Sequence, residues 1–287
     1  MRRLIRWNFS SRARQLSGGD AIVVSIPKSG RTWVRTFLCA HFCKRYGHPF
    51  SLEPEQYDDP RIPRILYSHD FFEQRTKADR WDAVRGKYLI PPTERRRAKI
   101  VLLARDPRDT FVSHYLQLTH RTRETPDPLK QKKIGDVLRD SRHGIASMIW
   151  VINAWLAEWS GNSNFLVVLY EELQRARAQA FRELLQFLGD TATDEQAFVH
   201  AIEFSRFDNM KKLEAAGAFA SKILRATDVD DPESFKVRRG KVGGFVDYLT
   251  GDDLDYANEA MQKLDPRIAA SIDVAAGRDH VVPVKSE

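Results

Sequence analysis

Four residues with phosphate-binding chemistry follow the apolar run AIVVSI at residues 21–26, namely Lys28, Ser29, Gly30 and Thr32. A strand that stops in a tight turn before a helix exposes backbone N–H groups at the positive end of the helix dipole. Gly30 lets the backbone approach a ligand closely, the hydroxyls add donors, and Lys28 adds a mobile positive charge. The segment predicts an anion site; a turn with incidental polar residues is the alternative.

A second constellation lies in LLARDPRDTFVSHY, residues 102–115. Arg105 follows another apolar run and precedes a proline that suits the first position of a helix. Arg105 therefore stands at the carboxyl end of a strand, where open α/β sheets bind ligands, and Ser113 follows about two helical turns later. A structural salt bridge from Arg105 to Asp106 or Asp109 is the alternative.

A third constellation is KVRRGKVGGF, residues 236–245, in which Arg238, Arg239 and Lys241 surround Gly240. Glycines that alternate with arginines in a loop indicate backbone and guanidinium groups that close on a phosphate. A solvated charged face is the alternative.

One histidine is placed to act as a base. His69, in LYSHDFF, comes just after a predicted strand, so it is expected at the same sheet edge as Lys28 and Arg105. A neutral imidazole with a pKa near 6.5 is suited to proton abstraction at neutral pH. A histidine that bonds to Asp70 or stabilises a turn is the alternative.

The elements that must position these residues alternate along the chain. Short apolar runs typical of strands covered on both faces recur at 21–26, 64–68, 99–104 and 164–170. Segments with helical spacing follow or separate them. Strand alternating with helix predicts an α/β fold with a central parallel β-sheet flanked by helices.

The expected helices and domain limits are these. Helical spacing covers 32–46, 107–118, 144–159 and 171–189, with Gly189 as a stop, whereas 121–133 reads as a long loop. We expect one domain over 1–287, with a core of about 20–265 and peripheral segments at 1–19 and 266–287.

Composition restricts the setting. A chain of 287 residues with 42% hydrophobic content can bury a sizeable core, and its net charge of +7 is compatible with anionic partners. Two cysteines, Cys39 and Cys43, make no disulfide framework, which favours a reducing, cytoplasmic location. No run is long enough for a transmembrane helix or a secretory signal. The basic N-terminal segment could touch a membrane surface, but packing on the domain is the favoured use. The sequence makes no prediction about the oligomeric state.

Five segments together resemble the cytosolic-type sulfotransferases that use 3′-phosphoadenosine-5′-phosphosulfate (PAPS). In chain order they are PKSGRTW, RDPRDTFVSHY, VVLYEEL, SRFDNMKK and RRGKVGGF. The resemblance implies a single-domain sulfotransferase fold of the P-loop NTPase-like, nucleotide-kinase-like type. It implies an enzyme that moves a sulfuryl group from PAPS to a hydroxyl or amine and releases adenosine 3′,5′-bisphosphate (PAP), with no metal.

The resemblance also implies residue roles. The 5′-phosphosulfate would be held by Lys28, Ser29, Gly30, Arg31 and Thr32. The 3′-phosphate would be held by Arg105, Ser113, Arg238, Arg239 and Gly240. The nucleoside would lie against Trp33, Tyr170, Ser205 and Phe207. His69 would be the catalytic base, and Lys28 would offset charge on the leaving phosphate in a direct in-line transfer.

This chain departs from the family pattern at three positions. Arg31 replaces a threonine, Arg239 stands where lysine is common, and Tyr67 occupies a position that often holds a lysine. The dimer-forming segment of the family is not recognisable. The acceptor is expected to be a small molecule, a lipid or a glycan, and to enter over loops such as 47–63, 70–80, 121–143 and 214–235.

Two other function classes stay open. A nucleotide kinase also uses a strand–loop–helix phosphate site, but the order G-x-x-x-x-G-K-[ST] is missing. A basic nucleic-acid-binding module would need a recognition motif, and none is present, so no nucleic-acid partner is expected.

Overall fold

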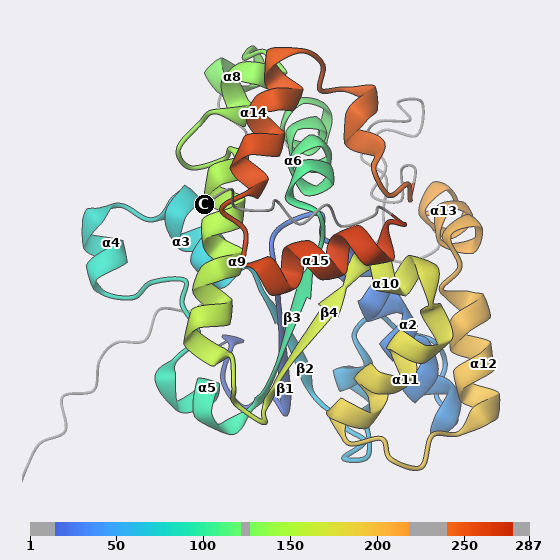
Figure 1. Ribbon diagram of the computed structural model, residues 1–287. Coiled ribbons are helices and arrows are strands. Elements are labelled where there is room, and N and C mark those ends of the chain that lie inside the picture. The colour runs from blue at the N-terminus through green and yellow to red at the C-terminus, as the bar shows by residue number, and fades with distance from the viewer. Residues whose placement is uncertain (1–14, 122–126, 218–239, 278–287) are drawn as a thin grey trace, which may run out of the picture.

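A four-stranded parallel sheet forms the centre of the computed structural model, which describes residues 15–121, 127–217 and 240–277. Its strands are β1 (Ala21–Ser25), β2 (Ile65–Ser68), β3 (Lys99–Ala104) and β4 (Phe165–Leu169). They lie in the order β2-β1-β3-β4, so the chain crosses over between strands through helices. Figure 1 shows this α/β arrangement, as the sequence predicted.

The register aligns the carboxyl ends of the strands at one edge. Val24 pairs with Ser68 on one side and with Leu102 on the other. Ala104 pairs in turn with Leu169. The residues that follow each strand therefore leave the sheet together.

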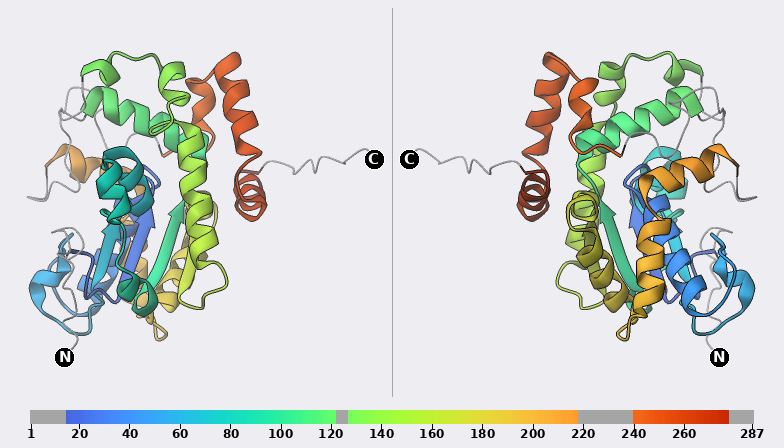
Figure 2. Two further views of the ribbon diagram at one scale, coloured as in Figure 1. Left: turned by 90° about the vertical axis from the view of Figure 1, so that its left-hand side faces the viewer. Right: turned by 90° about the vertical axis from the view of Figure 1, so that its right-hand side faces the viewer.

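Alternating side chains of the strands divide between two cores. Ile22 and Val24 are fully buried in one hydrophobic cluster, whereas Val23 and Val101 are fully buried in the other. Successive strand side chains point to opposite faces, so apolar residues at every position require helices on both faces. Figure 2 shows the helices on the two sides of the sheet.

Five of the described helices, among them α2, cover the face of the sheet that holds Val23. Phe37 of α2 stacks on Phe181 with ring centroids 3.7 Å apart. The helices of this face are α2 (Arg31–Arg45), α10 (Tyr170–Arg175), α11 (Arg177–Leu188), α12 (Glu195–Phe204) and α13 (Phe207–Ala215).

The helices that cover the Ile22 face are centred on α9, whose Trp155 is fully buried. They are α3 (Asp70–Lys77), α6 (Pro107–Leu116), α9 (Ile145–Trp159), α14 (Asp252–Met261) and α15 (Pro266–Ala275). The remaining described elements are α4 (Arg80–Val84), α5 (Pro92–Arg97), α7 (Asp127–Lys130), α8 (Ile134–Leu138), a π-helical turn (Gln117–Arg121) and two 3₁₀ turns (Pro54–Tyr57 and Gly244–Asp247).

All four expected strands are present, and their limits differ from the predictions by one residue at most at each end. The expected helix over 171–189 is two helices that break at Ala176, and Gly189 ends the second with a left-handed φ of 104°. The expected long loop over 121–133 contains the short helix α7. The single-domain limits over 1–287 stay a prediction.

Within the described ranges, no helix combines the length and apolar character needed to cross a bilayer. Both cysteines are buried as free thiols.

Candidate functional site

A cavity of about 700 Å³ opens at the carboxyl edge of the sheet. Its walls come from all four strand ends, from α3, α6 and α13, and from the segment after residue 240. Twelve residues that the sequence predicted for the site line it: Lys28, Gly30, Arg31, Thr32, Trp33, His69, Arg105, Ser113, Tyr170, Ser205, Phe207 and Gly240. Segments separated by up to about two hundred residues therefore converge on one space.

One predicted site residue does not line the cavity, and two others cannot be placed relative to it. Ser29 is 1% exposed and lies in the turn behind the cavity wall. Arg238 and Arg239 lie outside the described residues.

The loop after β1 makes a sharp left-handed turn. Lys28 has φ 78° and Gly30 has φ 97°, and Gly30 caps α2. A Cβ atom on Gly30 would lie 2.7 Å from the Tyr170 ring, so glycine is required both for the φ angle and for this close approach. The first turn of α2 lines the cavity and contains no acidic residue, so the helix dipole gives this part of the wall a positive potential.

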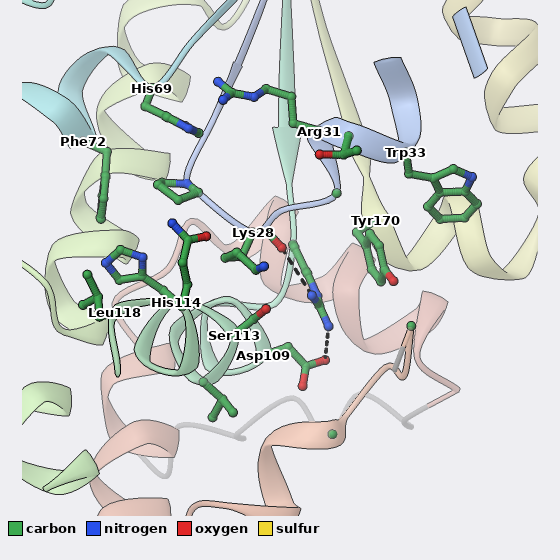
Figure 3. A pocket seen from close by; sticks show the side chains of 18 of the residues that line it. Lys28, Arg31, Trp33, His69, Phe72, Asp109, Ser113, His114, Leu118 and Tyr170 are labelled. Carbon is green, nitrogen blue, oxygen red and sulfur yellow. Dashed lines mark hydrogen bonds and ion pairs between the residues drawn. The ribbon is translucent and has the colours of Figure 1, made fainter. Parts of the chain in front are cut away.

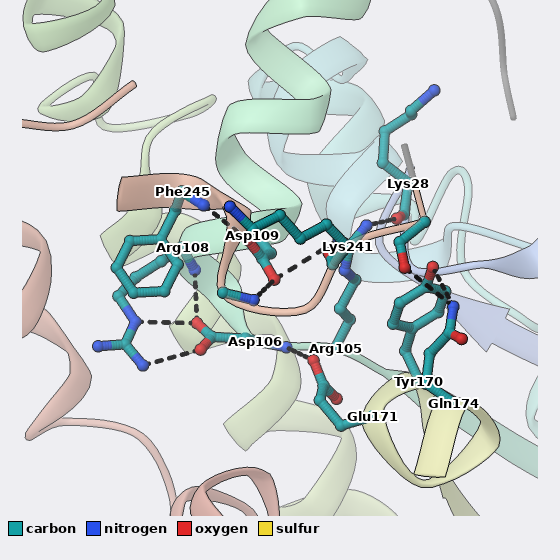
Figure 4. Close-up of polar contacts among 12 residues, drawn as sticks. Lys28, Arg105, Asp106, Arg108, Asp109, Tyr170, Glu171, Gln174, Lys241 and Phe245 are labelled. Atoms are coloured by element: carbon teal, nitrogen blue, oxygen red, sulfur yellow. Dashed lines mark hydrogen bonds and ion pairs between the residues drawn. The ribbon is translucent and has the colours of Figure 1, made fainter. Parts of the chain in front are cut away.

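Arg105 crosses the edge of the sheet and ties separate loops together (Figure 4). Its guanidinium donates to the Lys28 carbonyl at 3.3 Å and to the Lys241 carbonyl at 3.1 Å. Its guanidinium carbon lies 4.3 Å from the centre of the Tyr170 ring. Its Nε is buried and has no hydrogen-bond partner among the described residues.

The two carboxylates considered as alternatives for Arg105 have different partners. Asp109 lies 3.5 Å from the Arg105 guanidinium, whereas Asp106 accepts two hydrogen bonds from the Arg108 guanidinium and caps α6. The Asp106 N–H donates to buried Glu171, which links the ends of β3 and β4. Burial raises the pKa of Glu171 to about 7. Arg105 therefore both pairs with Asp109 and lines the cavity, so the salt bridge and the site role are compatible.

His69 lies just after β2 and its ring points into the cavity (Figure 3). Its Nδ1 lies 2.5 Å from the Ser25 carbonyl oxygen, which can only accept. In the neutral ring Nδ1 must therefore carry the hydrogen, and Nε2 is the basic nitrogen. The next residue, Asp70, accepts from the Ile90 N–H and the Trp155 indole, which anchors the start of α3.

The wall beyond His69 was not predicted residue by residue. It is formed by Phe72, Glu73, Thr76 and Lys77 of α3, by Val112, His114, Gln117 and Leu118 of α6 and the π-helical turn, and by Leu129 and His143. Of the expected acceptor loops, 70–80 and 121–143 contribute to it, 47–63 does not, and 214–235 falls largely outside the described residues. The spacing of apolar residues in α6 does not indicate that its polar residue His114 faces the cavity.

His114 is the most buried polar group of this wall. It is 4% exposed, its ring meets the Phe72 ring edge-on at 5.3 Å, and its Nε2 lies 3.5 Å from His143 Nδ1. Burial, with the nearby His143 and Lys28 charges, lowers the pKa of His114 to about 3. The ring is therefore neutral at physiological pH.

Tyr67, at a position that often holds a lysine in the family pattern, does not line the large cavity. Its ring lies under the Arg35 guanidinium, 4.7 Å from the guanidinium carbon, and packs on the Val23 face of the sheet. Strand alternation explains this, because Tyr67 points away from the face that holds Phe72.

Comparison with known proteins gives consistent matches. The model of the sulfotransferase domain family matches residues 19–268. Sulfotransferase 2B1 of Homo sapiens is 26% identical over 258 residues, which cover 80% of this chain and 62% of that protein. Cytosolic sulfotransferase 17 of Arabidopsis thaliana is 25% identical over 247 residues, which cover 80% of this chain and 70% of that protein. The chain thus spans less than two thirds of the human relative.

Solved structures with this fold include mouse sulfotransferase SULT7A1 complexed with PAP. That structure has a TM-score of 0.63 and 18% identity, and the match covers 93% of this chain and 94% of that chain. Retinol dehydratase in complex with androsterone and inactive cofactor PAP has a TM-score of 0.57 and 16% identity, covering 92% and 82%. At these identities the likeness establishes the fold.

The left-handed turn before α2 gives a stability prediction. Gly47→Ala places a Cβ at φ 75° with no atom within 4 Å, so it should cost only backbone strain, about 1 kcal/mol. Gly30→Ala adds the overlap with Tyr170 and should cost at least about 1 kcal/mol more. Urea unfolding measures both, and equal losses would contradict the role of the close approach.

The buried His114 gives a pH prediction. Its folded pKa of about 3 lies below the ordinary 6.5, so the unfolded chain binds the extra proton. The contribution of the neutral His114 ring to the free energy of unfolding is therefore complete above pH 6.5 and is lost as the pH falls towards 3. Between pH 7 and pH 5 the loss should be about 2 kcal/mol, and His114→Gln should lack it. Parallel pH slopes of unfolding free energy in both proteins would refute this.

Proposed function

The chain belongs to the sulfotransferase domain family, and on that premise we propose that it transfers a sulfuryl group from PAPS to an acceptor hydroxyl or amine. The observation that carries the proposal is the convergence of Lys28, His69, Arg105 and Gly240 on one cavity with the amino end of α2. The helix amides with Lys28 suit one anionic group of the donor, and the Arg105 guanidinium suits the other.

In the proposed complex the phosphosulfate end of the donor lies at the amino end of α2. Lys28, Ser29, Gly30, Arg31 and Thr32 would hold the 5′-phosphosulfate at the amino end of α2. The left-handed turn at Lys28 and Gly30 supports this assignment, because it brings the backbone and the first turn of α2 to the cavity wall.

The 3′-phosphate and the nucleoside would lie on the other side of Arg105. Ser113 and Gly240 line this side, and Arg238 and Arg239 directly precede Gly240 in the sequence. Trp33, Tyr170, Ser205 and Phe207 would enclose the adenosine; the Trp33 and Tyr170 rings are 5.6 Å apart and edge-on.

In the proposed step the acceptor oxygen bonds to sulfur as the bond from sulfur to the bridging oxygen of the 5′-phosphate breaks. His69 Nε2 takes the acceptor proton, because the Ser25 carbonyl holds the Nδ1 hydrogen in place. Lys28 offsets the charge that develops on the leaving phosphate. The products are the sulfated acceptor and PAP, so atoms and charge balance.

The acceptor side of the cavity is mixed in character. Phe72, Val112, Leu118 and Leu129 give it an apolar wall, and the Glu73–Lys77 ion pair at 3.1 Å lies on the same side. This supports an acceptor with an apolar body, such as an aromatic or lipid-like alcohol; small-molecule, lipid and glycan hydroxyls remain within the proposal.

The relatives that are named cytosolic, and the two buried free thiols, support a cytoplasmic location as part of the proposal.

Ligand binding separates this function from a nucleotide kinase. PAP at about 100 times its dissociation constant should raise the melting temperature by about 5 °C, whereas ATP with Mg²⁺ and adenosine 5′-phosphate should shift it much less. Arg105→Ala should remove most of the PAP shift. Arg108→Ala is the matched control, because that guanidinium bonds to Asp106 and Asn258. A shift with ATP alone would favour the kinase.

Kinetics of a histidine variant test the proposed base. His69→Ala should lower kcat about 10²- to 10⁴-fold while the PAP dissociation constant changes less than about threefold. The assay uses PAPS and the best acceptor from a library of hydroxyl compounds, with sulfated product detected by mass. His48→Ala, which removes a histidine that bonds to Asp59, should keep wild-type turnover. Wild-type turnover in His69→Ala would reject His69 as the base.

A further inference from the structure

A buried carboxylate lies within the cation-rich edge of the cavity. Asp109 is on the first turn of α6, is 4% exposed, and lines the cavity beside Arg105. A site that binds anions gains nothing from a carboxylate in direct contact with the ligand, because like charges repel. Asp109 must therefore be useful through the groups that it holds.

Asp109 binds the segment that follows Gly240. One carboxylate oxygen accepts from the Gly243 N–H at 2.8 Å, and the other accepts from the Phe245 N–H at 2.9 Å. These two bonds join the start of α6 to a segment more than 130 residues further along the chain. Figure 4 shows both, with the segment folded around the carboxylate.

Asp109 also contacts Arg105. The Oδ2 atom that accepts from Gly243 lies 3.5 Å from an Arg105 Nη atom, and that same Nη donates to the Lys241 carbonyl. The guanidinium, the carboxylate and the segment Lys241–Phe245 thus form a closed ring of contacts. Buried charges in this arrangement are tolerated only when they are paired and hydrogen-bonded.

Gly240 is fixed by neighbouring contacts. Its carbonyl accepts from the Gln174 amide at 3.1 Å, and a Cβ on it would lie 2.7 Å from the Phe207 ring. The segment is therefore held at Gly240 by Gln174 and at Gly243 and Phe245 by Asp109.

We infer that Asp109 is a positioning residue, which holds Arg105 and the segment 240–245 in the arrangement that receives the 3′-phosphate. The inference rests on the proposed function. It predicts that loss of the carboxylate weakens binding only of nucleotides that carry a 3′-phosphate, because within the described residues the hydrogen bonds to the Asp109 carboxylate come from Gly243 and Phe245.

The test compares two nucleotides and two variants by isothermal titration. Asp109→Asn should weaken PAP binding about ten- to a hundred-fold and leave the affinity for adenosine 5′-phosphate within about threefold of wild type. Asp106→Asn is the matched control. It alters a buried carboxylate of the same helix start that accepts hydrogen bonds from the guanidinium and the N–H of Arg108, so PAP affinity should stay near wild type.

Three results would overturn the inference: PAP affinity of Asp109→Asn within threefold of wild type, equal weakening of both nucleotides, or equal weakening by the two variants. Failure of wild-type protein to bind PAP at all would instead reject the proposed donor, so the two failures are distinguishable.

A second variant keeps the test decisive if Asp109→Asn does not fold by circular dichroism. Asp109→Glu retains the charge and displaces the carboxylate by one methylene, so it should keep the Arg105 pair and misplace Gly243 and Phe245. We expect a smaller loss of PAP affinity, again absent with adenosine 5′-phosphate. Unchanged PAP binding in this variant would overturn the positioning role.

Discussion

The parallel register of β1 with both of its neighbours is the constraint on which the rest depends. β1 is buried at every position, and its pairing with β2 and β3 fixes where the chain leaves the sheet. A shift of one residue in that pairing would turn each strand's side chains to the opposite face. It would also separate His69 from the Ser25 carbonyl, which sets the tautomer of the imidazole. The geometry of the base is thus a consequence of strand pairing.

The positive charge at the carboxyl edge of the sheet comes partly from Arg105, whose guanidinium is fixed by its neighbours. The Arg105 guanidinium is fixed by two carbonyls, by the Tyr170 ring and by Asp109. Burial lowers the pKa of Arg105, but the charges of Tyr170, Asp109 and nearby acids raise it overall, so the group stays cationic. Because these contacts hold the guanidinium in place, little reorganisation is required when an anion binds. Lys28 lies in the loop that follows β1 and lines the same cavity.

The sequence was sufficient for the layers and for the edge that carries the site, because short apolar runs and the polar residues after them are local signals. It placed Lys28, His69 and Arg105 at one edge because each residue follows a predicted strand of a parallel sheet, and all three line the cavity. It could not place His114 or Asp109, whose roles depend on which face of α6 meets α3 and the segment after Gly240. Local pattern likewise missed α7, since that helix has only four residues.

Backbone strain before α2 illustrates how the fold supports its site. A left-handed lysine is uncommon, and Lys28 adopts φ 78° beside a left-handed Gly30. Such a conformation persists only when the surroundings fix it. Here β1 is buried before the turn, and after it α2 is locked by Phe37, which stacks on Phe181, and by Trp33, whose ring meets Tyr170 edge-on. The core on the Val23 face therefore stabilises the strained turn, and the turn directs the amino end of α2 into the cavity.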